Sequence, residues 1–141
     1  MEYIRVTKEN LEKEHICCAI SNNKDVQVLS KKSWLLERFD EGLVFLKSEE
    51  RGKCFIEYIP AEYAWNPIDA KGYMYIDCLW VAGSFKGHGY ASELLNYCIE
   101  DSKKKGKKGL CIYHRAVVFY VNFKIAIFCS SDKILYVFQI R

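Results

Sequence analysis

The segment from Val81 to Ala91, VAGSFKGHGYA, has the composition of a loop that binds phosphate. Two glycines, Gly87 and Gly89, stand one residue apart, and the basic residue Lys86 precedes them. Glycine lets the main chain approach a ligand closely, and the free N–H groups at the start of a helix attract an anion. An apolar run before the segment and an amphipathic pattern after it predict a strand, this loop and then a helix. The sequence therefore predicts that main-chain amides here face a phosphate group.

Three kinds of phosphate-binding loop share this outline. A P-loop requires a Lys-Ser or Lys-Thr pair, and neither pair follows Gly87 or Gly89. A dinucleotide-binding fingerprint requires a third glycine where this chain has Ser92, and an acidic residue at the end of a strand about 20 positions further on. The third pattern, V-x-P-x-x-[RQ]-G-x-G-x-[GA], fits without an insertion from Val81 to Ala91.

Through this third pattern the segment resembles the acetyl-CoA-binding motif of the GNAT family of N-acetyltransferases. Two positions differ, because Gly83 replaces the proline and Lys86 replaces the arginine or glutamine. Lysine keeps the positive charge without the planar fork of arginine, and neither change removes main-chain donors. The resemblance is specific over about residues 74–112, generic before them, and poor over residues 114–141.

The resemblance implies an α/β (α+β) fold with a mixed central sheet flanked by helices. In this fold the fourth and fifth strands part, and the pantetheine arm of acetyl-CoA enters between them. The resemblance places the arm along the fourth strand and the pyrophosphate on the loop and on the first turn of the helix. The expected cofactor-binding residues are Leu79, Trp80, Val81, Lys86, Gly87, His88, Gly89, Tyr90, Ala91 and Ser92.

Acetyl transfer from a thioester to a primary amine requires an amine without its extra proton. An exposed amine of the lysine type has a pKa of about 10.4, so a base must remove a proton near pH 7. The resemblance implies direct attack in a ternary complex, with acetyl-CoA as cosubstrate and no metal. It also implies that a main-chain N–H of the fourth strand polarises the thioester and that a tyrosine protonates the leaving thiolate.

Asp77 and Tyr120 are the candidate catalytic residues. Asp77 is the only charge in an apolar strand, and alternation puts it on the same face as Tyr75 and Leu79. A partly buried carboxylate would have a raised pKa and could act as the base, although a structural hydrogen bond or a bend in the strand is the other explanation. Tyr120 matches the family's donor tyrosine in the A-x-x-F-Y sequence of residues 116–120, although a buried core aromatic fits this position too.

Other carboxylates offer alternatives. Glu57, on the neighbouring predicted strand, is a second candidate for the base. The loop of residues 60–72 carries Glu62 and Asp69 among aromatic side chains, which could bind a cationic amine or could simply pack. The spacing of residue types shows no Ser-His-Asp constellation and no cluster of metal ligands.

Composition narrows the class of protein. With 141 residues, the chain is expected to form one domain, 1–141. A net charge of +3 is too small to imply nucleic acid, and the lysine-rich residues 103–108 are typical of a solvated helix end. The longest apolar stretch, 116–129, is shorter than the roughly 20 residues of a membrane span. Seven cysteines without a C-x-x-C pair, and no apolar leader, predict reduced thiols in the cytoplasm.

Hydrophobic periodicity predicts the order β-α-α-β-β-β-α-β. The helix that follows the glycine loop is the best defined, because apolar residues recur at intervals of three and four positions. The predicted strands cover residues 3–6, 43–48, 53–59, 73–81 and 110–113, and the predicted helices cover residues 8–20, 30–40 and 91–104.

Residues 114–141 depart from the family pattern, which continues with a helix. The neighbouring Val117 and Val118 favour a strand, and residues 130–133 are typical of a turn, so a β-rich hairpin is predicted. An exposed hairpin could pair edge to edge and form a homodimer. A truncated or out-of-frame ending would also produce such a departure. The alternative function is therefore a catalytically impaired module that binds CoA.

Overall fold

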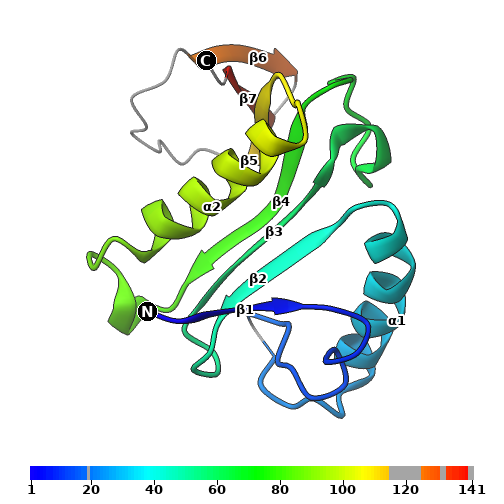
Figure 1. Ribbon diagram of the computed structural model, residues 1–141, viewed down its shortest axis with the longest axis vertical. Coiled ribbons are helices and arrows are strands. Elements are labelled where there is room, and N and C mark those ends of the chain that lie inside the picture. The colour runs from blue at the N-terminus through cyan, green and yellow to red at the C-terminus, as the bar shows by residue number, and fades with distance from the viewer. Residues whose placement is uncertain (19, 115–124, 131–132, 140–141) are drawn as a thin grey trace.

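The computed structural model describes residues 1–18, 20–114, 125–130 and 133–139, with side chains as far as Ile112. Within these residues, seven strands form one mixed sheet in the order β1-β2-β3-β4-β5-β7-β6 (Figure 1). The strands are β1 (Tyr3–Val6), β2 (Val44–Ser48), β3 (Cys54–Pro60), β4 (Met74–Val81), β5 (Gly109–His114), β6 (Ile125–Ser130) and β7 (Lys133–Gln139). The helices are α1 (Val26–Asp40) and α2 (Tyr90–Lys104), with short 3₁₀ turns η1 (Ala61–Tyr63) and η2 (Gly83–Phe85).

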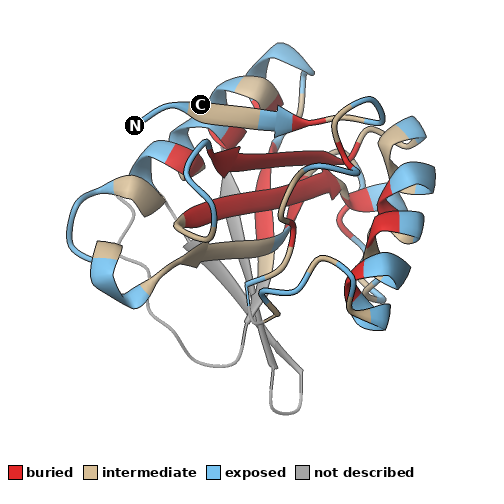
Figure 2. Ribbon diagram, turned by 90° about the horizontal axis from the view of Figure 1, so that it is seen from below, coloured by how far each residue is buried: buried red, intermediate tan, exposed pale blue. Residues whose placement is uncertain are grey.

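The two helices cover opposite faces of the sheet. Val28 and Leu35 of α1 belong to one apolar cluster, whereas Leu94 and Cys98 of α2 belong to another. Figure 2 shows the buried middle strands between the helices. Alternating side chains of these strands supply the two clusters, as expected for a sheet that is buried on both faces. The predicted fold class, a mixed sheet flanked by helices, is confirmed.

Local signals explain the limits of α1. The helix begins at Val26 rather than near Ser30, because the Asp25 carboxylate accepts a hydrogen bond from the Gln27 amide at 2.8 Å. After the helix, Gly42 has a φ of +89°, a conformation that glycine adopts without strain.

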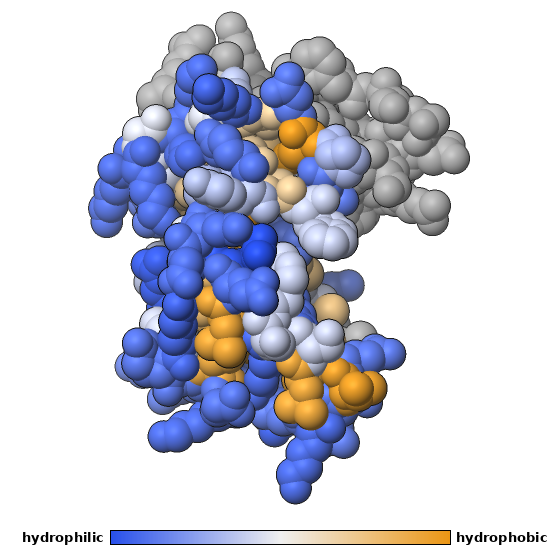
Figure 3. Space-filling view, turned by 90° about the vertical axis from the view of Figure 1, so that its right-hand side faces the viewer, coloured by the Kyte–Doolittle hydropathy of each residue, from blue (hydrophilic) through white to orange (hydrophobic). Residues whose placement is uncertain are grey.

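Figure 3 shows this side of the molecule, where side chains of intermediate hydropathy cross the middle of a mostly hydrophilic face.

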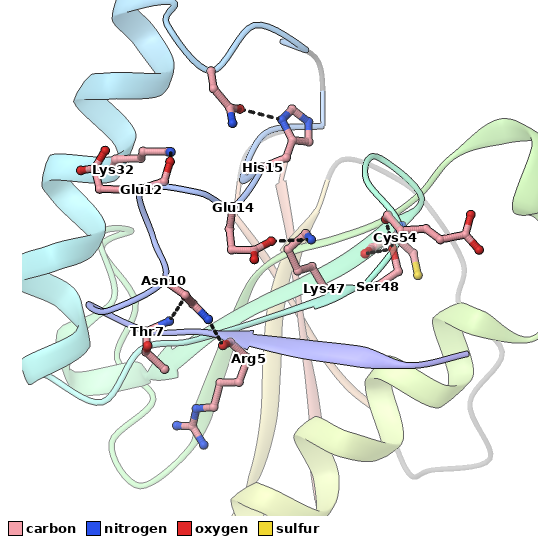
Figure 4. A network of polar contacts seen from close by, with 12 residues as sticks. Arg5, Thr7, Asn10, Glu12, Glu14, His15, Lys32, Lys47, Ser48 and Cys54 are labelled. Atoms are coloured by element: carbon pink, nitrogen blue, oxygen red, sulfur yellow. Dashed lines mark hydrogen bonds and ion pairs between the residues drawn. The ribbon is translucent and has the colours of Figure 1, made fainter.

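The helix predicted over residues 8–20 is wrong. Residues 8–14 form turns, and the Asn10 side chain stabilises them by accepting from the Thr7 amide at 2.8 Å and donating to the Arg5 carbonyl at 3.0 Å (Figure 4). Leu11 and Ile16 are both buried in the α1 cluster. Residues five positions apart do not share one face of a helix, so the segment must unwind to bury both.

Two buried lysines fix this N-terminal segment in place. Lys32 of α1 donates to the carbonyl of Glu12 at 2.7 Å, and Lys47 of β2 forms an ion pair with Glu14 at 2.8 Å (Figure 4). Both lysines are only 4 % exposed. A buried ammonium needs a partner, so the segment supplies the groups that the neighbouring elements lack.

The C-terminal strands form the hairpin that the sequence predicts. β6 and β7 pair antiparallel from Ile125–Phe138 to Ser130–Lys133. β7 also pairs antiparallel with β5, so it lies between β5 and β6. The two described strands of the tail thus extend the sheet beyond β5, on the side of that strand away from β4.

We expect Glu14→Gln to lower the free energy of unfolding by about 1–3 kcal/mol, because it leaves the buried Lys47 ammonium without its ionic partner. Glu12→Gln is the control, because the exposed Glu12 contributes its carbonyl and not its carboxylate. The control should change the free energy by less than about 0.5 kcal/mol. Urea denaturation measures both, and equal losses would contradict this role for Glu14.

Candidate active site

The site begins where two strands part. β4 and β5 are parallel neighbours only from the pair Met74–Leu110 to the pair Ile76–Ile112. Beyond Ile76, β4 continues to Val81 paired with β3 alone among the described strands. One edge of β4 therefore keeps unpaired main-chain N–H and C=O groups at alternate residues. The opening that the family resemblance implied is present.

A β-bulge lies at the point of parting. Tyr58 of β3 faces Ile76, and its neighbour Glu57 faces Cys78, so Asp77 is the extra residue on β4. A bulge bends its strand, re-aims a side chain and occurs next to active sites. This irregularity agrees with the bend that the sequence offered as an alternative explanation for Asp77. It leaves Asp77 without a paired residue on β3.

The bulge also changes which side chains share a face. Tyr75 packs in the α1 cluster, and so do Cys78 and Trp80, whereas Leu79 and Val81 pack in the α2 cluster. The prediction that Leu79 shares the face of Asp77 is wrong, because the extra residue reverses the alternation after it. Trp80 points to the other side of the sheet from Leu79 and Val81. Leu79, Trp80 and Val81 therefore share the open edge of β4 through their backbone and not through their side chains.

At the far end of β4, the glycine loop forms a hollow of ≈ 290 Å³. The loop leaves β4 through η2 and enters α2 at Tyr90. Gly87 and Gly89 both have a φ of +83°, and a Cβ on either would meet no atom within 4 Å. Besides Phe85, the residues that border the hollow all belong to the predicted cofactor site: Val81, Lys86, Gly87, Gly89, Tyr90, Ala91 and Ser92.

The amides of this loop are available to a ligand. Among the described residues, no hydrogen bond joins the amides of residues 87–92 to another protein group, and Gly89 caps α2 without a side-chain bond. The first amides of a helix have no partner within the helix, and they carry its positive dipole end. The sequence predicts that the Lys86 amide also faces the phosphate, but in the structure this amide donates to the Gly83 carbonyl at 3.3 Å. Lys86 can therefore offer its exposed side chain but not a free amide.

His88 supports the loop instead of lining the hollow. Its Nδ1 lies 3.1 Å from the Lys86 carbonyl and 3.3 Å from the Phe85 carbonyl, so this nitrogen must carry the proton and donate. Its ring stacks on Tyr90 with centroids 5.8 Å apart. These contacts hold the turn between the two glycines in shape.

Two carboxylates and one lysine meet at the bulge. Glu57 of β3 is fully buried, and its Oε2 forms an ion pair with Lys31 Nζ of α1 at 2.6 Å. Its Oε1 has no hydrogen-bond partner among the described residues. Asp77 is exposed and lines, together with Glu57 and Lys31, a second hollow on the α1 side. The sequence proposed both carboxylates separately, and the bulge brings them together.

The environment raises the pKa of both carboxyl groups. Burial is the largest cause, and it raises the pKa of Glu57. The charge of Asp77 raises this pKa further, whereas the charge of Lys31 lowers it. Loss of hydration also raises the pKa of Asp77, and the charge of Lys31 opposes this effect. Two nearby carboxylates with one ammonium can therefore bind a proton more readily than isolated carboxylates do.

A wider hollow of ≈ 420 Å³ surrounds this group on the α1 side. Gln27, Ser30, Lys31 and Trp34 line it at helical spacing on one face of α1, and Trp65 of the β3–β4 loop also lines it. The sequence missed the four residues of α1, whereas Trp65 lies in the aromatic loop that it offered for a cationic amine. The spacing i, i+3, i+4, i+7 would have grouped the four positions if the helix had been started at its aspartate cap.

The other predicted residues are placed as follows. Tyr120 lies outside the described residues. Glu62 closes the β3–β4 loop, because it accepts from the Gly72 amide at 2.8 Å and pairs with Lys107 at 3.4 Å. The lysine-rich end of α2 makes further ion pairs, Lys103–Glu100 and Lys105–Asp101. Across the described part of the chain, no three acidic, histidine or cysteine side chains are grouped to hold a metal ion. Neither described helix has the length and apolarity that crossing a membrane requires.

Lys31→Met should raise the pKa of both Glu57 and Asp77, because the lysine charge lowers both pKa values. Carboxyl carbon shifts followed by NMR titration measure this change. Lys8→Met is the control, because Lys8 pairs with the exposed Asp40 on another part of the surface. Unchanged titration of Glu57 and Asp77 in Lys31→Met would show that the ion pair does not tune the site.

Comparisons with known proteins agree with this geometry. A model of the acetyltransferase (GNAT) family matches residues 8–122. The uncharacterized N-acetyltransferase YoaP of Bacillus subtilis is 52 % identical over 111 residues, which are 78 % of this chain and 44 % of that protein. The chain thus spans less than half the length of this curated relative.

Solved structures share the fold at low identity. The ribosomal-protein-alanine N-acetyltransferase of Brucella melitensis has a TM-score of 0.65 at 17 % identity and covers 100 % of both chains. YncA of Salmonella typhimurium, solved with its cofactor acetyl-CoA, has a TM-score of 0.63 at 18 % identity and covers 99 % of this chain and 92 % of its own.

Proposed function

The chain belongs to the acetyltransferase (GNAT) family, and from this premise we propose that it transfers an acetyl group from acetyl-CoA to a primary amine by direct attack in a ternary complex. One observation carries the proposal. The parting of β4 from β5 leaves an open strand edge that runs from a pair of carboxylates near the middle of β4 to the glycine loop after its end. From Asp77 to Val81 this edge measures about 13 Å, at about 3.3 Å per residue.

The glycine loop fits the diphosphate of a coenzyme. The amides of residues 87–92 are free of partners in the described structure, and the α2 dipole adds positive charge. The exposed Lys86 side chain borders the same hollow and supplies a formal cation. Acetyl-CoA bound there would supply the activated acetyl group. The unpaired edge of β4 offers main-chain groups to the arm of the coenzyme and an N–H to polarise a thioester carbonyl.

Asp77 is the proposed base. An amine enters mostly as an ammonium ion and must lose a proton before it can attack. Asp77 is the solvent-reaching member of the pair, and its raised pKa makes it a better proton acceptor near neutral pH than an isolated aspartate. Glu57 is buried behind it and bound to Lys31, so we assign it a positioning role. The released proton then rests on a carboxyl pair whose charge Lys31 partly balances.

Four earlier predictions remain part of the proposal. Tyr120 is the proposed proton donor to the leaving thiolate, on the family resemblance alone. Residues 1–141 are treated as one domain, with residues 114–141 departing from the family pattern. A homodimer formed through the edge of the tail and a cytoplasmic location are the other two.

Gly89→Asp should abolish binding of CoA, because an aspartate at the start of α2 would repel the diphosphate and compete for the same amides. A thermal shift with CoA measures this. At a concentration of 100 times Kd, CoA should stabilise the native protein by about 2.7 kcal/mol, and the variant should show no such gain.

Gly106→Asp is the matched control. Gly106 also has a positive φ, +66°, and also has open space around it, but it follows the opposite end of α2. It should keep the full response to CoA. Loss of the response in both variants would point to strain in α2 and not to the loop. Stabilisation by CoA without thiol release for any amine would favour the impaired module.

Asp77→Asn should lower kcat by about 10²- to 10⁴-fold, the usual contribution of a general base. In the wild type, activity should fall as the pH drops through the raised pKa of the carboxyl pair, because the base is then protonated. This acid limb should move to higher pH in Lys31→Met. Asp69→Asn, in the exposed β3–β4 loop, should leave kcat and the pH profile unchanged. A normal kcat in Asp77→Asn would remove Asp77 from the mechanism.

A further inference from the structure

The hollow beside the carboxylates has walls of a distinct kind. Trp34 of α1 and Trp65 of the β3–β4 loop both line it, and Glu57 of β3 and Asp77 of β4 line it as well. A cavity of ≈ 420 Å³ is within the range that binds small organic ligands. Trp65 is one of the loop aromatics that the sequence offered for a cationic amine, whereas Trp34 had no ligand-binding role, and the proposed chemistry at Asp77 uses neither.

Trp65 is exposed but its backbone is anchored. Its side chain is 82 % exposed, the highest fraction among the large apolar residues of the described chain. On its N-terminal side, the Ala64 amide donates to the Ala61 carbonyl at 3.2 Å. On its C-terminal side, the Asn66 side chain donates to the hydroxyl of the buried Tyr75. The fold thus fixes a large aromatic surface in water, where a ligand that covers it would gain from burial.

Trp34 is oriented by a neighbour. The Arg38 guanidinium lies 6.0 Å from its ring centroid, which is the geometry of a cation–π contact. Arg38 itself is held by ion pairs with Glu37 and Glu41. The ring is partly buried in the α1 cluster and still borders the hollow. It therefore offers a second, fixed aromatic surface.

The charges of the hollow match one cation and no more. Glu57 and Asp77 contribute two negative charges when both are ionised, and Lys31 contributes one positive charge. The net charge of −1 balances a single ammonium ion. A second ammonium on the same ligand would find no further negative charge among the lining residues, and near Lys31 it would be repelled.

We propose that this hollow selects a monoamine with a flat, apolar body, whose ring contacts Trp65 and Trp34 while its amino group reaches the carboxylates. This inference rests on the proposed function, because the kinetic test requires acetyl transfer. It names the class of amine that accepts the acetyl group. The shape comes from the two indoles, and the limit of one charge comes from the two carboxylates and Lys31. Diamines and polyamines are thereby disfavoured.

Three amines with the same number of non-hydrogen atoms test the inference: 2-phenylethylamine, octylamine and 1,7-diaminoheptane. With acetyl-CoA present, kcat/KM should be highest for 2-phenylethylamine and at least about tenfold lower for the diamine. Trp65→Ala should lower kcat/KM for 2-phenylethylamine by about tenfold, mostly through KM, since an aromatic pair adds roughly this factor. Tyr63→Ala is the matched control, because Tyr63 is 52 % exposed on the same loop and does not line the hollow.

A second measurement does not depend on turnover. Tryptophan fluorescence should change when 2-phenylethylamine binds without acetyl-CoA, and this change should be reduced in Trp65→Ala but not in Tyr63→Ala. Binding of this kind without any acetyl transfer would support the acceptor site and overturn the proposed function. Equal kcat/KM for all three amines, unchanged in Trp65→Ala, would overturn the inference and leave the proposed function standing. Absence of both binding and turnover would overturn both.

Discussion

The site depends on the early end of pairing between β4 and β5. A parallel pair in the middle of a sheet normally continues until its shorter strand ends, because each unpaired main-chain group that is removed from water is costly. Here the pairing stops at Ile76, and the bulge at Asp77 follows directly. Beyond the bulge, β3 continues to pair with β4 while β5 does not. An edge of free N–H and C=O groups is thereby created inside a sheet, where a ligand can use it.

The same bulge sets the electrostatics. Without the extra residue, Asp77 would stand opposite a β3 residue within the ladder. With it, the carboxylate turns toward Glu57 and the α1 side. Two carboxylates in partly dehydrated surroundings repel one another, and a cation must accompany them. Lys31 supplies this cation from α1, so the helix that completes the fold on this face also determines how readily the pair takes up a proton.

The position of α1 depends in turn on the N-terminal segment. Lys32 and Lys47 are buried on either side of that segment, and each finds its partner within it. Burial of Leu11 and Ile16 in the α1 cluster adds an apolar anchor. A regular helix could not satisfy both requirements at once. The irregular segment therefore anchors α1 through these contacts. Because Lys31 and Trp34 belong to α1, their positions depend on the same contacts.

Features of local origin could be read from the sequence. The β3–β4 strands, the amphipathic α2 and the glycine loop each depend on neighbouring residues, so periodicity and the order of glycines predicted them. Tertiary structure alone decided the rest. The unwinding of residues 8–20 came from buried contacts with α1 and β2, and the reversal of faces after Asp77 came from pairing with β3. The meeting of Lys31, Glu57 and Asp77 joins residues from three elements, and no short-range pattern encodes a distance between elements that only packing brings together.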